Sequence, residues 1–106
     1  MKDFQLDTPL QFFVKQIRER LGDHLKQIIL FGSRARGDND PDSDYDCLIL
    51  VDEVTSQIKS IIYDIGGDTL YRYSILINSI PVSKKRFEQR DYNPLFTEAA
   101  REGIIL

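Results

Sequence analysis

Apolar side chains near the start of the chain recur every three or four positions, which is the spacing of a helix with one buried face. They are Leu10, Phe13, Val14, Ile17 and Leu21. This stripe predicts a helix from Pro9 to Leu21, because Pro9 suits a first helical turn and Gly22 a stop, with Thr8 as the candidate N-cap.

A second stripe at the same spacing predicts another helix, opened by Asp52 and Glu53. Its apolar positions are Val54, Ile58, Ile61, Ile62 and Ile65. Gly66 and Gly67 are poor helix formers, so this helix either ends there or continues, with a weak point, to about Tyr71.

Three shorter apolar runs predict strands, at residues 26–31, residues 46–51 and Ser74–Val82. The second run is apolar without interruption from Cys47 to Val51, so we expect a central strand with helices packed around it. Pro81 indicates an edge position or a strand end for the third run.

The last quarter of the chain predicts shorter elements. Residues 83–88 form a helical turn, Pro94 begins a helix that runs from Leu95 to Arg101, and Gly103 stops it. Residues 104–106 add a short edge strand or pack on the core. Together these elements predict an α/β (α+β) fold, a small β-sheet flanked by helices.

Length, charge and composition exclude several classes of protein. The 106 residues suit one domain, 1–106, and the net charge of −3 disfavours general nucleic-acid binding. No apolar stretch reaches the ~20 residues of a membrane span, and no signal peptide is evident, so we expect a cytoplasmic protein. Cys47, the only cysteine, is expected in the core, and His24, without a partner at ligand spacing, in a solvated loop.

A polar loop between residues 32 and 46 joins the first two strands and carries the candidate chemistry. Gly32 allows a sharp turn and the close approach of a bound group to the backbone. Ser33 is a good N-cap for a short helical turn, which Gly37 would stop. The N–H groups at such a turn attract phosphate.

Charged residues in this loop complete a candidate phosphate and metal site. Arg34 and Arg36 add positive charge near the turn. Asp44 and Asp46 are two residues apart at the start of a strand, so they point to one face and repel unless a cation lies between them. Mg²⁺ favours carboxylate and phosphate oxygens, so the pattern predicts metal-assisted phosphoryl or nucleotidyl transfer.

Simpler interpretations of the same residues stay open. The acidic series is also compatible with a solvated loop; it comprises Asp38, Asp40, Asp42, Asp44 and Asp46. A calcium loop counted from Asp42 would end at Glu53 but has Cys47 where glycine is needed. Arg34 and Arg36 could merely neutralise the aspartates, and residues 84–86 could form a solvated basic turn or contact an acidic partner.

Gly32-Ser33, ten intervening residues and Asp44-Tyr45-Asp46 resemble the signature of the minimal nucleotidyltransferases of the DNA polymerase β superfamily. Three later segments look like the rest of such a domain, so the resemblance covers nearly the whole chain: Ile80–Ser83, Phe87-Glu88 and Asn93–Ile104. It implies a nucleotidyltransferase fold with a small mixed sheet, ATP as substrate and Mg²⁺ as cofactor.

The resemblance also implies roles for individual residues. Gly32 and Ser33 would hold the triphosphate, Arg34 or Arg36 its charge, and the metal-binding, catalytic pair would be the two aspartates, Asp44 and Asp46. Active members usually carry a third carboxylate on a later strand, and Asn78 falls about at that position. An amide cannot serve as a general base, so nucleotide and metal binding is better supported than turnover.

Stand-alone members of this family often act as antitoxins beside a HEPN-type toxin, an all-helical ribonuclease. The resemblance therefore implies a protein that adenylylates and neutralises such a partner. The alternative is an antitoxin of the same fold that transfers nothing and acts by binding alone. A small-molecule acceptor is disfavoured because no acceptor domain is evident, and the oligomeric state stays open.

Overall fold

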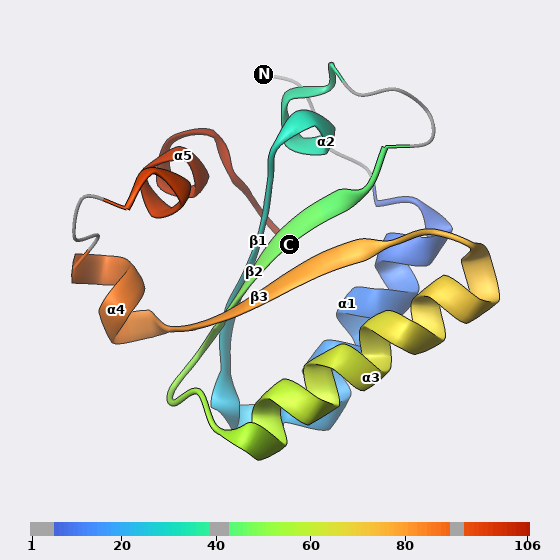
Figure 1. Ribbon diagram of the computed structural model, residues 1–106, viewed down its shortest axis with the longest axis horizontal. Helices are drawn as coiled ribbons and strands as arrows, with labels where there is room; N and C mark the ends of the chain where they lie inside the picture. Colours follow the sequence, from blue (N-terminus) through green and yellow to red (C-terminus); the bar gives the residue numbers. More distant parts are fainter. Residues whose placement is uncertain (1–5, 39–42, 90–92) are drawn as a thin grey trace.

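A four-stranded sheet with helices on both faces organises the protein in the computed structural model, which describes residues 6–38, 43–89 and 93–106 (Figure 1). The strands are β1 Leu25–Phe31, β2 Tyr45–Val51, β3 Ile77–Ser83 and β4 Ile104–Ile105. Their order is β3-β2-β1-β4, so β2 is central, as its apolar run predicts. The sheet is mixed because β2 pairs antiparallel with β1 and parallel with β3.

The helices divide between the two faces of the sheet. They are α1 Thr8–Leu21, α2 Ser33–Arg36, α3 Ser56–Tyr73, α4 Lys84–Gln89 and α5 Pro94–Glu102, with a 3₁₀ turn at Gly22–His24. Figure 1 shows α1 and α3 on one side, α4 and α5 on the other, and α2 at the upper end of β1. None of the described helices is long and apolar enough to cross a membrane.

Alternate residues of β2 enter two separate apolar clusters. Tyr45, Cys47 and the odd-numbered residues after them pack with α1 and α3. Leu48 and Leu50 pack with Phe87 of α4 and Phe96 of α5. Because both faces of β2 are covered, Cys47 is buried as expected, and burial raises the pKa of its thiol to about 12.

The starts of two helices differ from the prediction. Asp7, not Thr8, caps α1, because its Oδ1 accepts from the Leu10 N–H at 3.1 Å while Thr8 is already helical. Asp52 and Glu53 do not open α3; Thr55 caps it, its hydroxyl accepting from the Ile58 N–H at 3.1 Å. Which residue caps a helix therefore depends on the path of the chain before the helix, and not on residue type alone.

The helix α3 runs through the glycine pair and ends later than either predicted stop. Ser74, at φ 55°, forms its left-handed C-cap. Consequently β3 begins at Ile77 rather than Ser74. The edge position predicted from Pro81 is confirmed, and residues 104–105 form the short edge strand β4.

Candidate active site at the start of β2

Gly32 turns the chain from β1 into α2 in direct contact with the carboxylate of Asp46. Its φ of 79° and ψ of −159° lie in a region that only glycine adopts readily. A Cβ placed on Gly32 would stand 2.8 Å from Oδ2 of Asp46, closer than real Cβ contacts occur. The backbone conformation therefore favours glycine here, and any other residue would also have to displace the Asp46 carboxylate.

The two candidate metal ligands flank a residue whose side chain faces the other way. Tyr45 is buried against the α1 side of the sheet. Asp46 is partly buried and lies opposite Phe31 of β1, while Asp44, just before the strand, is exposed. Since side chains alternate along extended chain, we expect Asp44 on the same face as Asp46, which is the face that α5 covers further along.

Asn78 brings the third strand into this site. The parallel register pairs it with Asp46, and its Nδ2 donates a hydrogen bond of 3.0 Å to Oδ1 of that carboxylate. Three segments thus meet at one carboxylate: the turn after β1, the start of β2 and the second residue of β3. Asn78 therefore lies directly beside one of the two candidate metal ligands.

Arg34 holds the end of the polar loop against the sheet. Its Nε and Nη2 donate to the backbone oxygen of Ser43 at 3.0 and 2.7 Å, and its Cζ lies 4.4 Å from the centre of the Tyr45 ring. The Tyr45 hydroxyl in turn donates to Asp7, and burial together with this contact raises the pKa of Tyr45. These contacts fix the entry into β2 and so position Asp44 and Asp46.

Arg36 is turned toward α5. Its guanidinium lies 3.1 Å from Asp38, 3.0 Å from Glu98 and 3.7 Å from Glu102. The hydrogen bond to Asp38, followed by the charges of these acids, raises the pKa of Arg36. All four side chains are substantially exposed, so the pairs are weak and exchangeable.

Ser33 does not cap α2, because it is the first residue of that helix and Gly32 is at the cap. Gly37 ends the helix in a left-handed conformation, as expected.

The donor set suits a hard cation that shares its ligands with a substrate. Within the described residues, no group of three or more His, Cys, Asp or Glu side chains is placed to hold a metal. Asp44 and Asp46, with the amide oxygen of Asn78, would offer oxygen ligands, and Mg²⁺ commonly completes its octahedron with phosphate oxygens and water. Asp42, the first position of the alternative calcium loop, lies outside the described residues, as does Asp40.

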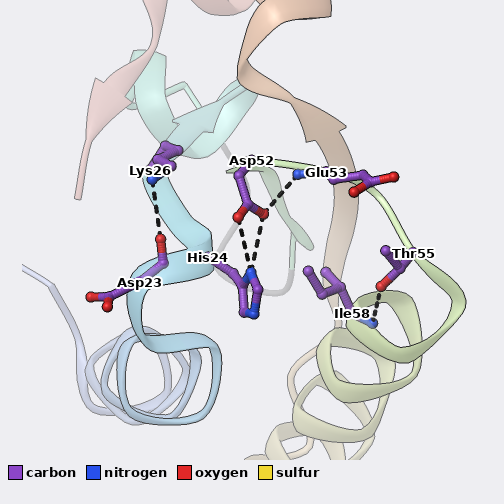
Figure 2. A network of polar contacts seen from close by, with 7 residues as sticks. All are labelled: Asp23, His24, Lys26, Asp52, Glu53, Thr55 and Ile58. Carbon is purple, nitrogen blue, oxygen red and sulfur yellow. Dashed lines mark hydrogen bonds and ion pairs between the residues drawn. The ribbon is translucent and has the colours of Figure 1, made fainter.

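A second polar cluster lies at the opposite end of β1 and β2 and takes no part in this site. Figure 2 shows both oxygens of Asp52 facing Nδ1 of His24, at 3.0 and 3.2 Å. The hydrogen bond from His24 lowers the pKa of Asp52, and the Glu53 N–H also donates to this carboxylate at 2.7 Å. His24 is exposed as expected, but it does have a partner that the sequence analysis missed.

Other partners were missed for the same reason. Asp7 contacts Tyr45 across 38 positions, and Arg36 pairs with Glu98 across 62. No local pattern signals such pairs, because they arise only when the sheet brings distant segments together.

The chain resembles known proteins over most of its length. A family model described as a nucleotidyltransferase domain matches residues 13–101. The Methanocaldococcus jannaschii protein MJ0604, named "Putative protein adenylyltransferase", is 32% identical over 100 residues, which are 94% of this chain and 96% of that protein. MJ0141 from the same organism, also named "Putative protein adenylyltransferase", is 47% identical over 73 residues, which are 68% of this chain and 74% of that protein.

Solved structures show the same fold at low identity. A chain from the crystal structure of a toxin–antitoxin with AMP-PNP matches with a TM-score of 0.63 and 15% identity, over 88% of this chain and 68% of that one. A chain from a mutant of the toxin–antitoxin MntA-HpeT matches with a TM-score of 0.62 and 16% identity, over 96% and 72%. These structures show the fold, and the family model with the relatives from Methanocaldococcus jannaschii shows that the chain belongs to the nucleotidyltransferase domain family.

Proposed function

We propose that the chain transfers AMP from ATP, with Mg²⁺, to a hydroxyl group of a partner protein, and that this partner is a HEPN-type toxin which the chain neutralises. The observation that carries the proposal is the contact of the Gly32 turn with the Asp46 carboxylate, beside Asn78. The names of the relatives support protein adenylylation, and the titles of the matching structures support a toxin partner.

Each residue of the site then has a defined task. Asp44 and Asp46 would hold Mg²⁺, which would supply positive charge opposite the phosphates, and the Gly32 turn with Ser33 would hold the triphosphate. Arg36 is the better candidate for phosphate charge, because its present partners are exposed side chains that it can exchange. Arg34 instead keeps the loop end in place.

The transfer is an in-line displacement at the α-phosphorus. The acceptor oxygen forms a bond to the α-phosphorus, the bond to the bridging oxygen breaks, and pyrophosphate leaves. The acceptor's proton passes to a carboxylate of the Asp44–Asp46 pair, since the amide of Asn78 has no basic site.

A second candidate function is neutralisation by binding alone. The observation that favours it is Asn78, an amide at the place beside Asp46 where a third carboxylate would promote turnover. In this alternative the fold covers the toxin's active site and no phosphorus bond changes.

The two candidates are separated by incubating the protein with labelled ATP, Mg²⁺ and the product of the adjoining gene. Adenylylation of that product supports the transferase if Asp46→Asn abolishes it and Asp64→Asn, at an exposed side chain of α3, retains it. Neutralisation without label, unchanged in Asp46→Asn, supports the binding protein. A wild-type chain that neither labels nor neutralises the product contradicts both.

A further inference from the structure

The outer edge of β3 and the adjoining side of α3 enclose a groove that ends at the candidate site. It measures about 390 Å³, and it is lined by Tyr63, Gly66, Gly67 and Leu70 of α3 and by residues 76–80. Asn78 belongs both to this lining and to the cluster around Asp46. Figure 1 shows α3 and β3 side by side at this border of the sheet.

The edge of β3 offers unused backbone hydrogen bonds. No described strand pairs with its outer side. The backbone oxygen of Leu76 accepts from the Tyr45 N–H at 3.1 Å, so Leu76 bonds toward β2. In a parallel pair of strands, residues whose backbone groups bond the neighbouring strand alternate with residues whose backbone groups face away from it. The backbone groups of Ile77 and Ser79 therefore point outward. Pro81 has the same parity, so its missing N–H limits the open edge to a short stretch.

Two consecutive glycines of α3 line the groove without an evident role in the fold. Both are helical and neither has a positive φ. An added Cβ would meet nothing within 4 Å at Gly67 and only Ile77 O, at 3.9 Å, at Gly66. Glycine in a helix interior is destabilising, so the pair lowers stability where alanine would fit. The space that they leave is explained if another molecule lies against them.

The chemistry of the lining indicates what that molecule is. Among the described residues that line the groove, none is charged. Tyr63, Leu70 and Leu76 are 56%, 45% and 41% exposed, which is unusual for large apolar side chains. An apolar groove beside an open strand edge suits an extended polypeptide, because backbone bonds hold it and alternate side chains enter the groove. A nucleic acid would require basic residues.

We infer that this groove binds the acceptor segment of the partner protein as an added strand on β3, over Gly66 and Gly67. The segment is extended and apolar around its hydroxyl residue, and Asn78 marks where that hydroxyl reaches Asp46. The inference rests on the proposed function for the reaction that follows, but docking and transfer can be measured separately.

The test is Gly67→Leu, which fills the groove without meeting protein atoms at its Cβ. The matched control is Tyr71→Leu, which adds the same residue one turn later, outside the lining, at a side chain 89% exposed. Binding of the adjoining gene's product is measured by calorimetry and AMP transfer with labelled ATP. We expect Gly67→Leu to weaken both by about tenfold or more, with ATP binding and thermal stability retained. Tyr71→Leu should match the wild type.

The outcomes distinguish this inference from the proposed function. Equal modification by wild type and Gly67→Leu overturns the groove but leaves the transferase intact. Binding without modification, weakened by Gly67→Leu, supports the groove and contradicts transfer. Failure of the wild-type chain to bind the product contradicts both. A wild-type dimer that Gly67→Leu converts to a monomer, seen by sedimentation, assigns the groove to a second copy and overturns the inference.

Discussion

Replacing Gly32 by alanine tests whether the turn and the carboxylate form one site. The residue would be held at φ 79° and ψ −159°, a conformation that costs non-glycine residues about 1–3 kcal/mol. In addition, its Cβ would stand 2.8 Å from Oδ2 of Asp46, so the carboxylate must move by several tenths of an ångström. For a domain of this size the strain lowers Tm by roughly 5–20 °C. The displaced ligand should also weaken Mg²⁺-dependent ATP binding.

Gly22→Ala is the matched control, because Gly22 also has a positive φ, 54°, but an added Cβ there meets nothing within 4 Å. We expect it to lower Tm while ATP binding is unchanged. Gly32→Ala should cost less stability in an Asp46→Ala background, since the clash is then absent. Calorimetry with ATP and Mg²⁺, together with thermal melts, measures all of these. Wild-type ATP affinity in Gly32→Ala, with no coupling to Asp46, would refute the reasoning.

Two further predictions concern residues away from the site. Cys47 is buried and its thiol pKa is raised to about 12, so at neutral pH it should react with a thiol reagent only as fast as the protein opens. The labelling rate should therefore rise with denaturant concentration. Fast labelling of the native protein would contradict the packing of β2. His24 lowers the pKa of Asp52, so this contact stabilises the fold above the ordinary pKa of an aspartate and the contribution disappears as pH falls through the lowered value. Melts between pH 6 and pH 3 should therefore lose less stability in Asp52→Asn than in the wild type, and an identical acid dependence would contradict the assignment.

The sequence predicts the elements of this fold better than it predicts their partners. The uninterrupted apolar run after Asp46 indicates a central strand, because only a strand covered on both faces buries every side chain, and the structure confirms it. Pro81 indicates the edge for an equally local reason. By contrast, the contacts of Arg36 with Glu98 and of His24 with Asp52 depend on strand order, which no short window encodes.

In the candidate site, too, residue types can be predicted locally while their contacts cannot. Counting along the sequence points to Asn78, and the register of two parallel strands places it beside Asp46. The need for glycine at position 32 is predicted from turn chemistry, whereas its contact with Asp46 follows only from the pairing of β1 with β2. A role for Arg34 in phosphate binding is predicted from its charge, whereas its hydrogen bonds to Ser43 O follow only from the folded path of the loop.

Asn78 sets how strongly the site depends on a cation. Its Nδ2 donates to Oδ1 of Asp46, so the amide stabilises that carboxylate without any metal. Asn78→Asp replaces this donor with a second negative charge opposite the first, and like charges at this distance repel. The variant should therefore melt lower than the wild type without Mg²⁺ and recover when Mg²⁺ is added. Asn78→Ser, which replaces the amide donor with a shorter hydroxyl group and adds no charge, should show little of this recovery. If Mg²⁺ affects wild type, Asn78→Asp and Asn78→Ser alike, the carboxylates at the start of β2 do not share a cation with position 78.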